Sequence, residues 1–326
     1  MTDAAATAPH PTVPHPATKP RRTLREWLTR NPVVLKELRG RMRGARAFIV
    51  LTVYLLLMSG FITLLYTLYI STTSSIYSTP DRQLLGKFVF GGVVAIEMLL
   101  VCFITPAFTV GAISGERERQ TYDLLRTTLL SERAFVLGKL ISALSYVFIL
   151  LLTALPLQSL AFLLGGVALE EVVIATLLLM MTAFLFGTAG IFFSSMMRRT
   201  LGATVLTYAF VLLATLGLPI LLFPVTILAG PFFGYSSPPV ELQIVLLYLF
   251  GLLIATNPVA TLIATEVILV SNQTLFYFTA PIYNPTSGNS INVPLISPWI
   301  PYVLFALGLG VVFTFLSIAN VARRER

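Results

Sequence analysis

The sequence predicts an all-α integral membrane protein that crosses the bilayer six times. Of its 326 residues, 56% are hydrophobic and 11% are charged, whereas about 25% of the residues of a soluble domain are charged. Several apolar runs reach the roughly 20 residues that a helix needs to cross a hydrocarbon core about 30 Å thick. These runs are continuous and do not alternate with polar residues, which favours helices over the strands of a membrane β-barrel.

Six apolar runs are expected to span the membrane within a transmembrane domain over residues 47–321. They are 47–70, 87–111, 135–165, 172–196, 201–230 and 299–321. A seventh stretch, 240–270, is interrupted by Asn257-Pro258, and its second piece is short for a span. We expect this stretch to re-enter the membrane from the outside as a helical hairpin. It is part of a larger external segment, a hairpin and a loop, over 231–298. Two additional spans are the alternative.

The basic residues predict the orientation. Of the 22 Lys and Arg residues, all but two lie before the first span, in the loop after the second span, in the turn after the fourth, or in the C-terminus 322–326. The segment 231–298 has neither Lys nor Arg. Since cytoplasmic loops are enriched in basic residues, we expect a multi-pass protein with both termini in the cytoplasm. The expected location is a bacterial plasma membrane. The net charge of +8 then reflects topology and contact with membrane lipids, and we expect no nucleic-acid partner.

The segment before the first span divides into two parts. Residues 1–30, rich in Ala, Pro and Thr, predict a disordered cytoplasmic tail without a signal peptide. Residues 31–46 predict an amphipathic elbow helix in the inner membrane interface, with Asn31 as its N-cap. Its basic face consists of Lys36, Arg39, Arg43 and Arg46. This helix either anchors the topology or braces a partner subunit.

The stretch ISGERERQTYDLLRTTLLSERAFVLGKLIS, residues 113–142, is densely charged although it lies between two spans. A helical projection separates an apolar face from a charged face. The apolar face has Thr121, Leu124, Leu125, Thr128 and Leu129, and the charged face has Glu116, Arg119, Asp123 and Arg126. One interpretation is a solvated loop with charge pairs along it. We expect instead that the loop 114–133 forms a short cytoplasmic coupling helix that transmits motion from a docked partner.

This stretch resembles the first cytoplasmic loop of ABC-2 type transporter permeases, which often reads Glu-Arg-Glu-x-Gly-Thr-x-Asp/Glu-Leu-Leu. The matching residues are Glu116, Arg117, Glu118, Thr121, Asp123, Leu124, Leu125, Leu130, Ser131, Gly138 and Lys139. The segment 31–46 resembles the entrance helix of the same family, so the resemblance covers nearly the whole chain. The sequence departs from the family pattern at Gln120, where many relatives carry Gly, and at Leu129, where Pro is common.

The resemblance implies a permease subunit of an ATP-driven ABC transporter, and it favours export. Such a subunit pairs with a second permease copy or a paralogue and with a separate ABC ATPase subunit. The residues expected to couple to the ATPase are Glu116, Arg117, Glu118, Arg119, Thr121, Asp123, Leu124 and Leu125. A membrane subunit that transports nothing and only transmits ATPase-driven motion is the alternative.

The chain is not expected to bind ATP itself. A phosphate-binding loop reads GxxxxGK[ST], but around Gly138-Lys139 the first Gly is replaced by Arg133 and the hydroxyl residue by Leu140. We therefore expect ATP and Mg²⁺ on the partner subunit and no cofactor on this chain. The predicted spans contain no His, so neither a base for Ser114 nor a His-rich metal site is assembled, and we expect no enzyme activity and no metal.

Three further features lie in or near the spans. Glu97 falls near the middle of the second span, where an unpaired charge is costly, and either faces the translocation path or serves helix packing. Ala183 and Gly187 have the spacing of a close helix contact. Glu170-Glu171 falls in an outer turn and is most simply a solvated connection.

Overall fold

The computed structural model describes residues 45–73, 82–121, 131–233, 239–272, 274–283 and 289–323. Six helical segments within this part of the chain are long and apolar enough to cross a membrane. They are Phe48–Thr72, Gln83–Glu118, Glu132–Leu164, Leu169–Met196, Thr200–Ile220 and Trp299–Arg323. Each overlaps one of the expected spans, so the prediction of an all-α membrane protein with six spans is confirmed.

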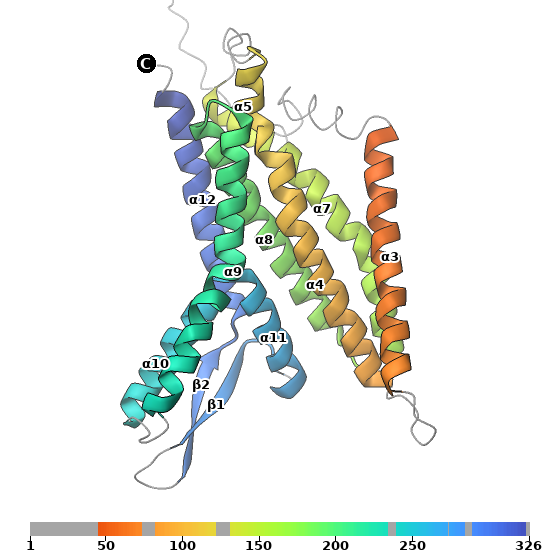
Figure 1. Ribbon diagram of the computed structural model, residues 1–326, viewed down its shortest axis with the longest axis vertical. Coiled ribbons are helices and arrows are strands. Elements are labelled where there is room, and N and C mark those ends of the chain that lie inside the picture. The colour runs from red at the N-terminus through yellow and green to blue at the C-terminus, as the bar shows by residue number, and fades with distance from the viewer. Residues whose placement is uncertain are drawn as a thin grey trace, which may run out of the picture.

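The spans form one bundle of long helices (Figure 1). The helices are α3 (Ala45–Thr73), α4 (Arg82–Thr109), α7 (Glu132–Leu164), α8 (Leu169–Met196), α9 (Thr200–Phe233) and α12 (Trp299–Arg323). The short helix α5 (Gly111–Glu118) follows α4 directly. The start of α3 and the end of α12 lie at the same end of the bundle as α5 (Figure 1). We call this end the α5 end.

Helix α8 forms the centre of the bundle. In its most apolar window 72% of the residues are buried, compared with 17–44% in the other spans. It packs most extensively along α12 and also contacts α4, α7 and α9. Small residues permit this approach: a Cβ atom added to Gly187 would lie 2.7 Å from Cδ2 of Leu144, and one added to Gly190 would overlap Oγ1 of Thr109. Gly187 therefore lies in the close helix contact expected from its spacing with Ala183.

Two shorter helices, α10 (Val240–Ile254) and α11 (Pro258–Asn272), lie at the opposite end of the bundle (Figure 1). Their axes differ by 117°. Asn257 fixes the bend, because its side-chain amide donates to the carbonyl oxygens of Ala214 (2.8 Å) and Thr215 (2.9 Å) in α9. Its Oδ1 atom accepts from the N–H of Ala260 (2.9 Å) and so caps α11. The break expected at Asn257-Pro258 is thus the point where the structure turns.

An antiparallel pair of strands follows α11, although the sequence predicts only an external loop there. Strand β1 (Tyr277–Tyr283) pairs with β2 (Ser290–Ile296). We call the end of the bundle that carries them the hairpin end. The sequence pattern does not indicate these strands, because they contain Pro281 and Pro294, and Pro is depleted in strands. Both strands of a two-stranded sheet are edge strands, where Pro is tolerated.

Candidate functional site at the end of α5

Helix α5 ends in a Schellman motif that reverses the chain. The N–H of Gln120 donates to the carbonyl oxygen of Arg117 (3.1 Å), and the N–H of Thr121 donates to that of Glu116 (3.0 Å). The motif requires a residue with a positive φ after the helix, and Gln120 has a φ of 57°. Gly adopts this conformation without steric cost. The departure from the family pattern at Gln120 therefore falls on a position where the backbone favours Gly.

Glu116 joins α5 to α7. The Nζ atom of Lys139 donates to Oε1 of Glu116 over 2.7 Å, and the hydroxyl of Thr121 donates to Oε2. The Lys139 side chain is only 5% exposed and its ammonium lies 5.9 Å from the centre of the Phe135 ring. A buried ammonium needs a counter-charge, so this ion pair fixes α5 against α7.

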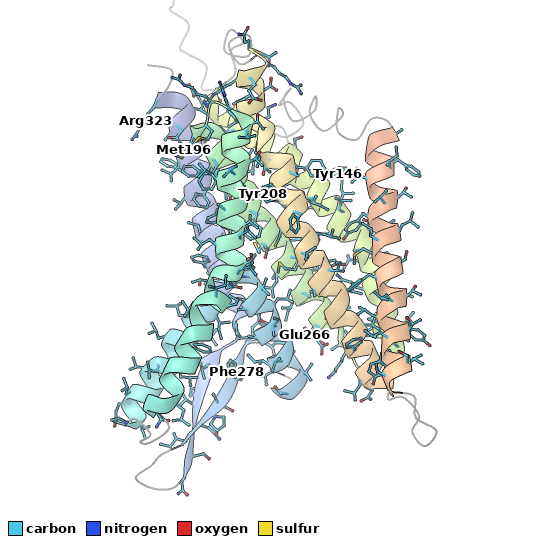
Figure 2. The ribbon with its side chains drawn as sticks, in the orientation of Figure 1. Tyr146, Met196, Tyr208, Glu266, Phe278 and Arg323 are labelled. Atoms are coloured by element: carbon cyan, nitrogen blue, oxygen red, sulfur yellow. The ribbon has the colours of Figure 1, made fainter. Side chains whose placement is uncertain are left out.

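Arg117 joins α5 to the C-terminal end of α8. Its Nη1 atom donates to the carbonyl oxygens of Ser195 (2.9 Å) and Met197 (3.0 Å). The last carbonyls of a helix have no partner within the helix, and a cation at that end complements the helix dipole. Figure 2 shows Met196 at the α5 end, where α8 finishes. Arg117 therefore serves as a C-cap supplied by another helix.

Glu118 joins α5 to the N-terminal end of α9. The N–H of Thr200 donates to Oε1 of Glu118 and the hydroxyl of Thr200 donates to Oε2, both over 2.8 Å. Thr200 is the first residue of α9, so the carboxylate lies at the positive end of that helix dipole. The turn between α8 and α9 is thereby held from both sides, by Arg117 and by Glu118.

A buried serine pair holds α5 to α8 one turn earlier. The Oγ atom of Ser194 accepts from the N–H groups of Ile113 (3.0 Å) and Ser114 (2.9 Å). The hydroxyl of Ser114 donates to the carbonyl oxygen of Val110 (3.0 Å). Both serines are fully buried. The hydroxyl of Ser194 donates to that of Ser114 over 3.2 Å, so the Ser114 side chain also helps to attach α5 to α8.

Three consecutive residues therefore bond to three different spans. We call Glu116, Arg117 and Glu118, with their partners on α7, α8 and α9, the α5 clamp. Of the residues expected to couple to an ATPase, these three bond to spans of the bundle, Thr121 bonds to Glu116, and Arg119 is exposed. The remaining ones, and the elbow residues, lie outside the described residues: Asp123, Leu124, Leu125, Lys36, Arg39 and Arg43.

The sequence gives little indication of the clamp's partners. The residues Lys139, Ser195 and Thr200 lie 23 to 82 positions away from their partners in α5, and no local spacing relates them to it. Among these partners, Lys139 alone matches the family pattern, and this match is the one signal in the sequence that points to it.

Glu97 lies in the interior of the bundle. It is fully buried, and Nε2 of Gln158 in α7 donates to its Oε2 atom over 2.6 Å. The Oε1 atom of Gln158 accepts in turn from the hydroxyl of Thr176 in α8 (3.5 Å). Glu97 thus links α4 to two neighbouring spans of the same chain. Its role in a translocation path stays a prediction.

Comparison with known proteins accounts for this architecture. The family model described as "ABC-2 family transporter protein" matches residues 32–319, which include α5, the first five spans and most of the sixth. A comparison with curated proteins finds no match. The chain therefore belongs to the ABC-2 family of transporter proteins, as a permease component of an ABC transporter.

Proposed function

We propose that this chain is the membrane subunit of an ATP-driven exporter whose ATPase is a separate subunit. Membership of the ABC-2 family supports a partnership with an ABC ATPase. The observation that carries the proposal is the α5 clamp, in which Glu116, Arg117 and Glu118 bond to α7, α8 and α9. The clamp directly precedes the rest of the loop 114–133, the segment we propose as the ATPase contact.

The clamp gives the loop a physical means of moving the spans. Charge-assisted hydrogen bonds are shorter and stronger than neutral ones. When α5 is displaced, these bonds should therefore hold, and the helices bonded to α5 should move with it. Arg117 and Glu118 hold the adjoining ends of α8 and α9, and Glu116 holds α7 near its start. Closure of the ATPases would therefore tilt three spans together, through the loop 114–133 and the elbow 31–46, and open a path toward the hairpin end.

The charge distribution supports a cytoplasmic location for the α5 end. The described part of the chain has eight basic residues at that end: Arg46, Arg117, Arg119, Arg133, Lys139, Arg198, Arg199 and Arg323. The hairpin end has Arg82 and Lys87. An excess of basic residues marks the cytoplasmic side. We infer that the chain lies in a bacterial plasma membrane, with both termini in the cytoplasm. Strands β1 and β2 then lie outside the cell.

A second permease copy or a paralogue completes the proposed transporter. Helix α8 fills the centre of the bundle. In its most apolar window, 72% of the residues are buried. This filled centre favours a path between two permease chains over one inside a single chain. Large apolar side chains are exposed along α3, α9 and α12, which suits contact with lipids and with the second copy. ATP and Mg²⁺ would be bound by the ATPase.

The test is a purification of the tagged chain in mild detergent, with identification of partners by mass spectrometry and an ATPase assay on the eluate. The expected result is recovery of a nucleotide-binding subunit with ATPase activity. A folded chain that recovers no ATPase from its native membranes would contradict the proposal. Cargo flux into inverted vesicles then separates an exporter from the alternative, a subunit that only transmits motion.

A further inference from the structure

A cavity of about 450 Å³ lies at the hairpin end, far from the α5 clamp along α8. Four elements form its walls. They contribute Lys87 of α4, Val167 of the turn between α7 and α8, Glu170 and Glu171 of α8, and Leu269 of α11. Small-molecule sites commonly enclose about 300–1,000 Å³, so the cavity has room for a small organic ligand.

Glu171 is the buried polar group of this cavity. The sequence predicts a solvated residue, but Glu171 is 6% exposed, because the turn before α8 and helix α11 cover it. It lies three residues after Ala168, the N-cap of α8, which is the position of the acidic residue in a capping box. The Oε2 atom of Glu171 has no hydrogen-bond partner among the described residues, so the wall of the cavity holds a buried acceptor that lacks a donor.

The cavity is built on a close backbone contact. Gly166 has a φ of 84°, and a Cβ atom there would overlap the carbonyl oxygen of Gln83 at the start of α4. A Cβ atom on Gly86 would overlap the carbonyl oxygen of Gly165. Helix α4 and the turn before α8 are therefore in contact through their backbones. This contact fixes the position of Lys87 relative to Glu171.

The charges around the cavity are predominantly negative. Glu170 and Glu171 line it, and Glu266 on α11, labelled in Figure 2, lies close enough to Glu171 and Lys87 for their charges to act on it. Lys87 is the cation among the lining residues. The lining therefore attracts a positively charged group.

We propose that this cavity binds an organic cation, a primary ammonium carried on a small apolar body. The ammonium donates a hydrogen bond to Oε2 of Glu171, and Val167, Leu269 and Leu275 contact the apolar body. A metal ion fits less well, since the described residues contain no group of three or more His, Cys, Asp or Glu placed to hold one. The ammonium can come from a free amphiphilic amine or from the headgroup of an amine-bearing lipid. This binding site goes beyond the proposed ATPase coupling and does not depend on it.

Trp299 provides a local reporter of binding. Its Nε1 atom donates to the carbonyl oxygen of Leu275, a residue of the cavity wall, over 2.7 Å. The chain has two Trp residues, so replacing Trp27 by Phe leaves Trp299 as the single tryptophan. A ligand that displaces Leu275 changes the environment of the Trp299 indole and hence its fluorescence.

The experiment uses the full-length Trp27→Phe chain in phosphatidylglycerol nanodiscs, which contain no amine lipid. The probe is n-hexylammonium, and n-hexanol is the neutral probe of the same length. We expect a saturable fluorescence change with n-hexylammonium alone. Glu171→Gln keeps the size and the acceptor oxygen of the side chain but removes its charge, so binding should weaken by at least about tenfold. Glu241→Gln, an exposed carboxylate outside the cavity wall, should leave binding unchanged.

Several outcomes would overturn the proposal: equal responses to the two probes, unchanged binding in Glu171→Gln, or equal losses in both Glu variants. If Glu171→Gln does not fold, Val270→Phe narrows the cavity without altering Glu171 and should likewise weaken binding. Nanodiscs with added phosphatidylethanolamine identify the source of the ammonium. Competition with n-hexylammonium supports a lipid headgroup, and its absence supports a free amine.

Discussion

Lys139 and Glu116 meet across the junction of α5 and α7, with 2.7 Å between Nζ and Oε1. They are 23 positions apart in the chain, and the segment between them includes most of the loop 114–133. The ion pair therefore closes the base of the segment proposed to contact the ATPase. Because the Lys139 side chain is 5% exposed, the pair differs from an exposed ion pair, which contributes about 0–1 kcal/mol.

The first prediction is strong coupling between Glu116 and Lys139. Glu116→Gln removes the carboxylate that pairs with the buried Lys139 ammonium, and Lys139→Met removes the ammonium that pairs with the Glu116 carboxylate. Each change should lower the free energy of unfolding by about 3 kcal/mol, and the double variant should lose less than the sum. Unfolding by SDS titration in mixed micelles measures all four chains of the cycle. Additive single effects would show that the two side chains do not stabilise one another.

The second prediction separates ATPase binding from force transmission. Asp123 belongs to the proposed contact and Glu118 to the clamp, so Asp123→Lys should reduce recovery of the ATPase in the pull-down. Glu118→Gln should preserve recovery but lower cargo flux per ATP hydrolysed, because the hydrogen bonds to Thr200 at the start of α9 are weakened. Membrane insertion of both variants is the control. Loss of ATPase recovery in Glu118→Gln would assign this residue to the contact itself.

The third prediction concerns the end of α5. Gln120 has a φ of 57°, which costs a residue with a Cβ atom about 1–2 kcal/mol relative to the right-handed conformation. Gln120→Gly should therefore raise the free energy of unfolding by up to about 1 kcal/mol, part of the gain being offset by the greater freedom of Gly in the unfolded chain. Gln120→Ala retains the Cβ atom and should give no gain. An equal response to both substitutions in thermal unfolding would exclude backbone strain as the cause.

The sequence predicts the spans well and the clamp poorly, for a physical reason. The hydrophobic run length that carries a helix across the bilayer is local, so the six spans and the break at Asn257-Pro258 are visible in it. The bonds from α5 to Ser195 and Thr200 depend on how distant helices pack, which no local pattern contains. The sequence does not predict strands β1 and β2, because each contains a Pro, Pro281 in β1 and Pro294 in β2.

The fourth prediction tests the role of Glu97. In Glu97→Gln the side chain keeps an oxygen that accepts from Gln158 but loses its ionisable group, so the packing of α4 against α7 should persist. If Glu97 contributes to the translocation path, cargo flux should change while the free energy of unfolding stays within about 1 kcal/mol. Gln158→Leu removes the donor, leaves the buried carboxyl without it, and should lower stability by about 1–3 kcal/mol. Unchanged flux in Glu97→Gln across a pH series would leave Glu97 with a packing role alone.

The fifth prediction compares two glycines of α4. A Cβ atom on Gly86 would overlap the carbonyl oxygen of Gly165, whereas a Cβ atom on Gly91 meets nothing within 4 Å. Gly86→Ala must force apart two backbones, so it should cost at least about 1–3 kcal/mol and disturb the cavity next to Lys87. Gly91→Ala gains the helix propensity of Ala and should be neutral or stabilising by up to about 1 kcal/mol. SDS titration measures the change in the free energy of unfolding of each variant, and n-hexylammonium binding is the second readout. Equal changes in the two variants would mean that α4 does not approach the turn before α8 this closely.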